Sequence, residues 1–436
     1  MKRILTVIIL TFAMLYTFGL SRVSALELDF TGEYRNRGWW LTNFDINTTE
    51  LTENSAFWDN RFRLQANARI SDDLEGVVRL LAADNENWGT LHYRSRSFDP
   101  NQPLDNRQRY NVHADLVEVD LAYVKLNLPN TPFMVKLGKM DLNLGHSIVL
   151  GSEMTWDTLA LKGVSENIHY GLFTAKYHEG DVTMASDDID LYGLYINLNP
   201  QEDVNFGIYA VYGNHSSKDP DRLAIIPAGS NSIGFDNSFN TAYWIGVTST
   251  MNVEPLKVKF EFDHSNLTLD KEVTGDNDRD TTGFAAYADV SGMAANLTLG
   301  GSILFASGEE AGQTGDSDAF SPIFSRFSYM NDYDLITLYW VRDDILTNML
   351  AFQFYLKGRM FDDQVTTKLS AQYYQLNEEE MNDKVIGTEI DARISFNIYQ
   401  NLSFTGKAGY LLTDSEYFGE DDDDIWLLGH EWVFSF

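Results

Sequence analysis

The sequence predicts an all-β fold: a transmembrane antiparallel β-barrel of about 18 strands, with short turns on one rim and long loops on the other. Three observations support this prediction. Apolar and polar residues alternate along most of the chain after residue 26, a secretory-type segment stands at the N-terminus, and the chain ends in a strand with aromatic residues at every second position. In such a barrel one side of each strand faces lipid and the other faces a polar lumen.

The N-terminal segment reads as a signal peptide. Lys2 and Arg3 precede an apolar run over 4–20, and Val23-Ser24-Ala25 places small residues where a signal peptidase cuts. A membrane anchor is the alternative, but the run is near the lower limit for a helical span and the cleavage pattern follows it directly. We therefore assign 1–25 to the signal peptide and 26–436 to the barrel. Cleavage removes three basic residues and no acidic ones, so the formal charge falls from −32 to −35.

Composition excludes several classes of protein. The absence of cysteine rules out a disulfide scaffold, a thiolate zinc site and a cysteine nucleophile. The acidic charge argues against nucleic acid as a partner, because phosphate binding needs a basic surface. A chain of 436 residues has room for two or three domains, yet a large barrel uses this length as one, and no linker divides it.

A period of two is clearest in three stretches, 58–70, 256–263 and 389–398. In the second, Val258, Phe260 and Phe262 occupy one parity, and the other parity carries Lys257, Lys259, Glu261 and Asp263. A strand places these two sets on opposite faces. Each stretch is therefore predicted to have an apolar, lipid-facing side and a charged side.

About eighteen segments show this pattern, and an even number is expected of a bacterial barrel. They begin near 27, 57, 74, 115, 133, 155, 167, 189, 204, 240, 256, 281, 295, 333, 347, 364, 385 and 425, with one more near 402 and the weakest pattern at 155. Short turns are predicted at 71–73, 129–131, 199–203, 252–255, 358–363 and 399–401. Long polar segments occupy 43–56, 89–114, 214–239, 266–280, 307–332, 375–384 and 413–424. This alternation predicts that the long loops lie outside the cell.

The last strand predicts how the barrel is inserted. Trp432, Phe434 and the terminal Phe436 alternate along it, a pattern like the signal that barrel-assembly machinery recognises. We expect that machinery as a partner through Phe436, with outer-membrane lipids and lipopolysaccharide around the barrel, and localisation in the outer membrane of a Gram-negative bacterium. A soluble two-sheet sandwich also alternates. Against it stand the opposite charges along the polar parity and the aromatic residues at strand ends: Trp39, Trp40, Trp58, Trp88, Tyr123, Tyr212, Tyr243, Trp244, Tyr410 and Trp426.

The charged parity is the predicted pore lining. Its basic members are Arg61, Arg63, Arg69, Arg79, Lys257, Lys259, Lys368, Arg393 and Lys407, and its acidic members are Glu118, Asp120, Glu261, Asp263, Glu389 and Asp391. Facing rows of opposite sign across a water-filled pore create a transverse field that sets selectivity. The alternative is a network of ion pairs that holds the barrel round. A dominant positive ring would favour anionic solutes, whereas dominant carboxylates would favour cations or neutral sugars.

Metal and catalytic sites have weaker support. Residues 276–280 have the oxygen spacing of a calcium loop, but Thr281 and Tyr287 stand where such a loop has Gly and Glu. A solvated acidic loop, bridged to lipopolysaccharide by divalent cations, explains the segment as well, so no metal site is predicted. The eight histidines are scattered outside known catalytic motifs, although His169 and His430 are conceivable bases of a lipid-modifying barrel enzyme. We predict no catalytic residue and no cofactor.

Three segments resemble the alginate-export family of outer-membrane porins. These are 133–139 with Leu144-Gly145 and Trp156-Asp157, then Ser307-Gly308-Glu309 with 320–324, and 387–391 before Asn401-Leu402. The resemblance implies an 18-stranded barrel and transport. Lys139-Met140 departs from the family's Arg-Gln, and the acidic charge is unusual for a conduit with a basic constriction. The Leu-Gly-Lys segment also resembles phosphate-selective porins.

The predicted function is therefore an outer-membrane porin or channel for the passive passage of small hydrophilic solutes or of a polysaccharide. A phosphate-selective or general porin is the nearest alternative, and a lipid-modifying barrel enzyme is the alternative of a different class.

Overall fold

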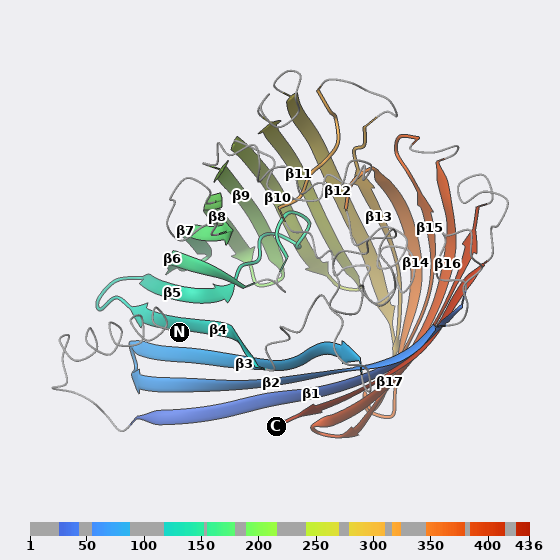
Figure 1. Cartoon of the computed structure of the whole chain (residues 1–436), viewed down its shortest axis with the longest axis horizontal. Helices are drawn as coiled ribbons and strands as arrows, with labels where there is room; N and C mark the ends of the chain where they lie inside the picture. The colour runs from blue at the N-terminus through green and yellow to red at the C-terminus, as the bar shows by residue number, and fades with distance from the viewer. Residues whose placement is uncertain are drawn as a thin grey trace, which may run out of the picture.

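The computed structural model describes residues 26–42, 55–87, 117–151, 155–178, 189–215, 241–269, 279–309, 316–323, 346–379, 384–414 and 424–436. These residues form one antiparallel sheet of 18 strands (Figure 1). Its strands are β1 (Glu27–Thr42), β2 (Ser55–Ser71), β3 (Leu74–Asn87), β4 (Glu118–Asn127), β5 (Phe133–Asp141), β6 (Thr155–Ser165), β7 (Ile168–His178), β8 (Ile189–Gln201), β9 (Val204–His215), β10 (Thr241–Val253), β11 (Leu256–Leu269), β12 (Arg279–Ala294), β13 (Leu297–Ala306), β14 (Met349–Met360), β15 (Val365–Gln375), β16 (Val385–Tyr399), β17 (Leu402–Thr413) and β18 (Ile425–Ser435). The expected signal peptide, 1–25, lies outside the described residues.

The sheet closes into a barrel because β1 pairs with β2 on one side and with β18 on the other. The end of the chain completes this seam: the Gly32 N–H donates to the Phe436 carbonyl at 2.7 Å, and the Phe436 N–H donates to the Gly32 carbonyl at 3.0 Å. Closure leaves no strand edge and pairs the ladder's backbone groups, as a membrane barrel requires. The predicted all-β barrel of 18 strands is confirmed.

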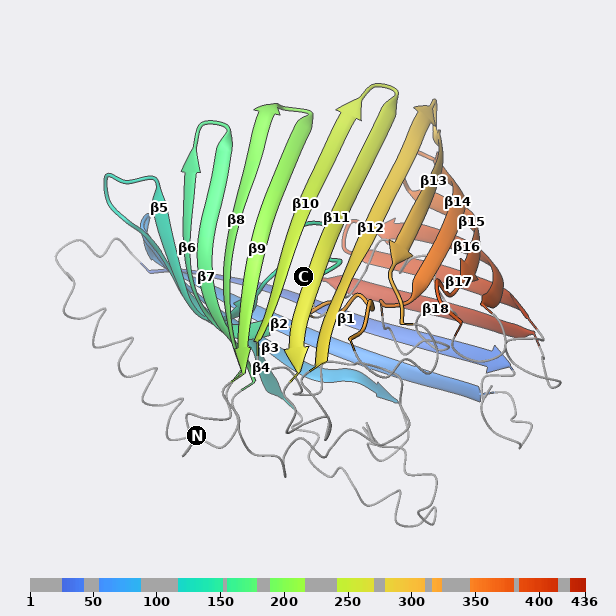
Figure 2. The same cartoon turned by 90° about the horizontal axis from the view of Figure 1, so that it is seen from above.

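The expected strands near 155 and 402 are both complete and form β6 and β17. The segment expected near 333 lies outside the described residues, and β13 pairs directly with β14. The short turns that join β2 to β3, β8 to β9 and β10 to β11 lie on one rim (Figure 2). The strand ends that flank most of the predicted long loops lie on the opposite rim, and the loops themselves fall largely outside the described residues.

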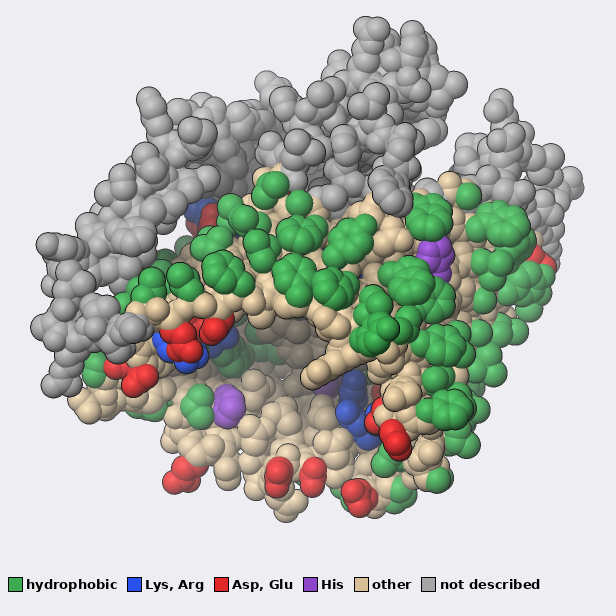
Figure 3. Space-filling view, turned by 90° about the horizontal axis from the view of Figure 1, so that it is seen from below, with side chains coloured by type: hydrophobic (Ala, Val, Ile, Leu, Met, Phe, Trp, Pro, Cys, Tyr) green, Lys and Arg blue, Asp and Glu red, His purple; other side chains and the backbone are tan. Residues whose placement is uncertain are grey.

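Alternate residues of each strand point to the two sides of the wall. On the outer side, Leu299 and Phe354 are 67% and 71% exposed, whereas on the inner side Glu261, Asp263 and Glu389 are 0% exposed. Apolar side chains cover much of the outer surface, and charged side chains gather in the central hollow (Figure 3). An apolar exterior around a polar interior is the arrangement of a barrel surrounded by lipid.

Two connections turn inward and fill part of the lumen. The inner segments, which we define as residues 142–151 and 316–323, bury Ile148, Leu150 and Phe320 completely. They pack with side chains from the barrel wall such as Trp244 in one apolar cluster. The barrel therefore has a hydrophobic core on one part of its interior and a polar surface on the rest.

Three of the predicted interfacial aromatic residues face inward instead. Trp244 is fully buried in the apolar cluster, and Trp39 and Tyr123 contact lumenal cations. Among the others, Trp40, Trp58, Tyr212, Tyr243 and Tyr410 are exposed on the outer face, Trp426 packs edge-on against Trp40, and Trp88 lies outside the described residues. The side of the wall that a residue faces depends on whether its position along the strand is odd or even, and not on how near it lies to the strand end.

The calcium-loop pattern does not form a loop in its second half. Residues 276–278 lie outside the described residues, and Thr281 and Tyr287 belong to β12, whose extended backbone cannot wrap around an ion. Within the described ranges, no cluster of three or more His, Cys, Asp or Glu side chains is arranged to hold a metal ion. No helix in the described part of the chain is long and apolar enough to cross a membrane.

Candidate pore lining and constriction

Most of the charged residues predicted to line the pore lie on the inner parity of the wall, within the span of the strands. Arg69 is an exception, because it stands at the rim of the short turns, 56% exposed, and pairs with Glu27 at 3.2 Å. Glu118 and Lys257 are also exposed near strand ends. The inner set is not uniform: the register of the strands collects its members into four groups with different partners.

The first group is a row of four cations on neighbouring strands. Lys357 of β14 is the direct partner of Lys368 in β15, Lys368 is the partner of Arg393 in β16, and Arg393 is the partner of Lys407 in β17. We call these four residues the basic row. Directly opposed like charges repel one another in a sheet, and opposite charges or an anion in the lumen offset that repulsion.

Aromatic rings and the acid Glu431 contact members of the basic row. The ammonium groups of Lys357 and Lys368 each lie 4.8 Å from the centre of the Tyr355 ring. Lys407 lies 5.3 Å from the Trp39 ring and pairs with Glu431 at 3.3 Å. Cation–π contacts hold the lysines against the wall without neutralising their charge. The row therefore brings four cations, two aromatic rings and the carboxylate of Glu431 together on the lumenal side of the wall.

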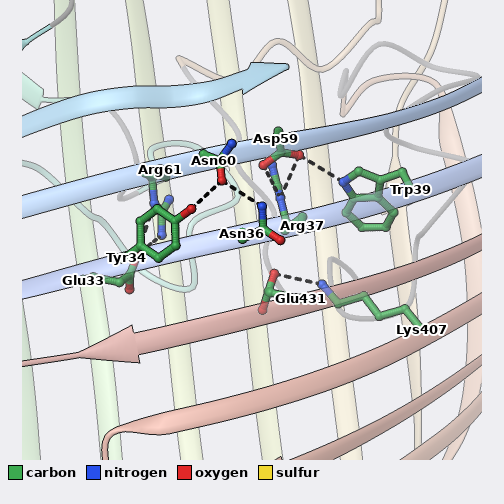
Figure 4. A network of polar contacts seen from close by, with 10 residues as sticks. All are labelled: Glu33, Tyr34, Asn36, Arg37, Trp39, Asp59, Asn60, Arg61, Lys407 and Glu431. Atoms are coloured by element: carbon green, nitrogen blue, oxygen red, sulfur yellow. Dashed lines mark hydrogen bonds and ion pairs between the residues drawn. The ribbon is translucent and has the colours of Figure 1, made fainter. Parts of the chain in front are cut away.

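A second group occupies β1 and β2 (Figure 4). Arg61 pairs with Glu33 at 2.7 Å, and the Arg37 guanidinium donates to both oxygens of Asp59 at 2.9 and 3.1 Å. The Trp39 indole N–H donates to the same Asp59 at 3.1 Å. Here acids offset the basic residues, so this side of the wall is an ion-pair network of mixed sign.

The third group joins β2, β3, β4 and β5. Asp120 accepts a hydrogen bond from Arg79 at 2.6 Å and lies 3.8 Å from Arg63. Arg79 also lies 3.8 Å from Asp141. Asp120 thus serves two arginines, and Asp141 adds a second carboxylate beside Arg79.

The fourth group holds an inner segment in place. The Tyr209 hydroxyl lies within hydrogen-bond distance of both Glu261 and Asp263, and the backbone N–H of His146 donates to Glu261 at 2.6 Å. Gly145 has φ of +57°, and a Cβ added there would lie 2.3 Å from Glu261 Oε1. These carboxylates therefore anchor residues 142–151 instead of facing an open pathway.

The remaining predicted acids are buried within the wall lining. Gln372 donates to Asp391 at 2.7 Å, and Glu389 is 0% exposed. Between β11 and β12, Lys259 is the direct cross-strand partner of Asp289.

The two inner segments also bind each other and the wall. The Ile323 N–H donates to the Val149 carbonyl at 3.0 Å, and the Trp244 indole N–H donates to the Ser321 carbonyl at 2.7 Å. From the sequence, 320–324 was predicted to lie in an outer loop, and no structural role was predicted for 142–154. The apolar run Ile148-Val149-Leu150, which interrupts the polar character of a connection, was the available signal.

The predicted pore lining also left out several charged residues that face the lumen. Arg35, Arg37 and Asp59 alternate along β1 and β2 with the correct parity, and Lys357 does so in β14. Of the two histidines considered as bases, His430 lies on the outer face, where its ring contacts Trp58 edge-on at 4.8 Å. His169 lies in β7 beside the turn from β6. The two are therefore on different strands that do not pair.

Comparisons with known proteins identify the fold. No protein-family model and no curated protein matches the chain. Solved structures do: Pseudomonas aeruginosa OccK8 (OprE) has a TM-score of 0.57 at 10% identity, covering 94% of this chain and 98% of that one. The outer membrane protein OpdK of the same species has a TM-score of 0.54 at 11% identity, covering 94% and 99%, and a structure of OpdK with vanillate has a TM-score of 0.55 at 10% identity, covering 94% and 98%.

These likenesses establish the architecture and leave the alginate-export resemblance unconfirmed, since no family model matches. A closed antiparallel barrel with an apolar exterior is the form of integral proteins of the Gram-negative outer membrane. The chain is thus an outer-membrane β-barrel that shares the porin-type fold of these Pseudomonas aeruginosa proteins.

Proposed function

We propose that this protein is a passive outer-membrane channel for small hydrophilic solutes, that it has no catalytic role, and that it prefers anions. The observation that carries the preference is the basic row, which places four cations side by side across β14 to β17. Like charges in directly opposed positions are unfavourable in a sheet. A chain that keeps them there gains a local site for negative charge.

The net acidity of the chain does not oppose this proposal. Exposed charges more than about 8–10 Å away are largely screened at physiological ionic strength. In a narrow pore, short-range fields from the wall dominate. The inner segments narrow the lumen and so bring a passing solute close to the wall, where the basic row acts.

A neighbouring structure gives the proposal its chemical class. OpdK, which has a similar fold, was solved with vanillate. Vanillate carries one carboxylate on an aromatic ring, and the basic row of this protein combines lysines with the Tyr355 and Trp39 rings. Small organic carboxylates are accordingly the solutes to test first.

The reversal potential in a salt gradient across a planar bilayer tests the proposal. The wild type should show discrete open-channel steps with anion preference. The triple variant Lys368→Gln/Arg393→Gln/Lys407→Gln should lose that preference, whereas Arg69→Gln, at the exposed rim, should keep it. Unchanged selectivity in the triple variant would remove the basic row from the pathway. A silent protein that releases fatty acid from lipid would instead support the barrel enzyme.

Polysaccharide export is the second candidate, because the resemblance to alginate exporters and a multivalent basic row both fit a polyanion. The same recordings separate the two: an oligouronate that blocks the current far better than a single uronate would favour the polymer. Equal block by both would favour small solutes.

A partner surface belongs to the same proposal. Lys139, Asp157, Lys176 and Asp190 are successive cross-strand partners on the outer side of β5 to β8. Asp190 lies two residues nearer the long loops than Tyr192, which is exposed on the outer face. We assign this row to the headgroups of lipopolysaccharide. Lys139→Gln/Lys176→Gln should retain less lipopolysaccharide on purification than Lys384→Gln.

A further inference from the structure

The outer face of the barrel carries a polar patch on β1, β2 and β18. Tyr34, Asn36, Asn60 and His430 belong to the outward parity of these strands, and we call them the outer polar patch. Tyr34 is 40% exposed, Asn60 and His430 are half-buried, and Asn36 is 8% exposed between its neighbours. At outward positions of β8 and β9 the residues are instead Leu194, Ile196 and Ile208, which are 44%, 39% and 49% exposed. The amides are the unusual members, because Tyr also occurs in interfacial girdles.

The two amides meet each other across the strands. Asn36 and Asn60 are direct cross-strand partners, and Asn60 Oδ1 accepts hydrogen bonds from Asn36 Nδ2 and from the Tyr34 hydroxyl, both at 2.8 Å (Figure 4). Among the described residues, Asn60 Nδ2 and Asn36 Oδ1 make no hydrogen bond. The pair thus leaves one amide donor group and one amide acceptor unmet.

The depth of the pair makes these unmet groups costly. Asn36 stands four residues from Trp40, an exposed outer aromatic, which is about 13 Å along a strand. With a strand tilt of about 40° the vertical separation is about 10 Å. At that depth there is no water to bond an amide, so an unsatisfied polar group is destabilising.

We propose that the outer polar patch is the contact surface for a second copy of this chain, which pairs about a two-fold axis. A two-fold interface needs a surface that complements itself. A donor and an acceptor held side by side meet that need, because each copy's Asn60 Nδ2 can donate to the other's Asn36 Oδ1. Asparagine side chains stabilise association between membrane segments in this way.

The surroundings of the patch fit close approach. His430 has glycine as its direct partner on both sides, Gly38 in β1 and Gly406 in β17. The His430 ring covers Gly38, where an added Cβ would lie 2.3 Å from it, whereas at Gly406 the nearest atom to an added Cβ is 3.5 Å away. Gly406 is therefore the small residue that lets two backbones approach in a membrane. Trp58 and Trp40 stand beside them, 46% and 44% exposed, and supply large apolar contacts. The proposed dimer does not depend on what the lumen conducts. Either proposal can therefore fail while the other holds.

The chain has no cysteine, so an introduced cysteine is the only thiol available for site-directed cross-linking. Asn60→Cys and, as a control at an outward position of β8, Leu194→Cys are expressed in cells, and isolated outer membranes are treated with a bifunctional maleimide. Heat-modifiable gel mobility confirms that each barrel is folded. We expect a product of twice the chain mass for Asn60→Cys and only monomer for Leu194→Cys.

A second pair of variants tests the amides themselves. With Trp58→Cys as reporter, Asn36→Leu/Asn60→Leu should reduce dimer cross-linking severalfold, whereas Thr174→Leu on β7 should not. Monomer alone at both reporter sites, equal cross-linking at Leu194→Cys, a product with the mass of a different protein, or no effect of the leucine substitutions would each overturn the proposal.

Discussion

The backbone N–H of His146 donates to Oε2 of Glu261 at 2.6 Å, although the two residues are 115 positions apart in the sequence. This bond ties a segment that enters the lumen from β5 to the wall at β11. The constriction therefore depends on carboxylates that do not themselves face the pathway.

Removing the Glu261 carboxylate should loosen this inner segment. In Glu261→Ala the His146 N–H is left without its acceptor, at a cost of about 1–3 kcal/mol. We expect larger and noisier single-channel currents in planar bilayers. Glu261→Gln keeps an acceptor oxygen and should change them less, and Glu202→Ala, in a turn at the opposite rim, serves as control. Wild-type currents from Glu261→Ala would contradict an anchoring role.

Gly145 should tolerate no side chain. Its φ of +57° costs an L residue about 1–2 kcal/mol, and a Cβ there would also lie 2.3 Å from Glu261 Oε1. Gly145→Ala should lower the midpoint of heat modification on gels. The matched control is Gly76→Ala, where a Cβ has no neighbour within 4 Å. Equal midpoints for the two variants would show that the segment can move aside.

Acid should weaken the seating of residues 142–151 through His146, which lies outside the strands. Burial lowers the pKa of its ring below the usual value, and Lys259 and Lys257 lower it further, while hydrogen bonds to the Ser249 and Phe260 carbonyls raise it. A released segment with an ordinary pKa near 6.5 binds a proton more readily than the seated one. Stability is therefore present above about pH 6.5 and is lost as the pH falls toward the lower, seated pKa.

Bilayer recordings between pH of about 7.5 and about 5 check this expectation. Current noise should rise on acidification in the wild type. In His146→Gln, which cannot gain a charge, the rise should be much smaller. An identical pH response in both proteins would assign it to other groups.

Removing the negative charge of Asp120 should raise anion preference. The carboxylate bonds Arg79 at 2.6 Å and lies 3.8 Å from Arg63, so Asp120→Asn leaves both arginines less compensated. The reversal potential should move further toward that of the anion, with a stability loss of about 1–3 kcal/mol. Asp203→Asn, in the turn between β8 and β9, is the control. An unchanged reversal potential would place this group outside the pathway.

The terminal Phe436 should matter for assembly in cells. Its backbone closes the barrel seam at Gly32, and its aromatic ring matches the pattern that assembly machinery is proposed to read. Phe436→Ala keeps the backbone bonds but removes the ring. We expect a severalfold loss of folded protein in cells and a small loss on refolding into detergent. Equal losses in both settings would assign the ring a packing role alone.

The strands could be predicted from the sequence because alternation is a local property. In β11 and β16 the charged and apolar sets stand on the faces that period two assigns, since adjacent side chains of a strand always point to opposite sides. Trp244 was predicted to lie at the lipid boundary because it is a tryptophan near a strand end. Its position in the alternation of β10 places it on the inner face instead.

Which charges meet was not predictable from the sequence. Lys357, Lys368, Arg393 and Lys407 form one row only because three hairpin registers align them. Glu261 and Asp263 were grouped with the pore lining, yet a distant segment covers them. The apolar run over 148–150 indicates that this connection is buried, but it does not identify the wall residues that the connection contacts.

The sequence by itself determined the class of fold, the two faces of each strand and the acidic character of the chain, because these depend on neighbours along the backbone. Only the tertiary structure decided the basic row, the anchored inner segment and the pairing of Asn36 with Asn60. Those contacts join residues far apart in the chain, and the register of strands and the path of loops, which the whole barrel fixes together, bring them within reach.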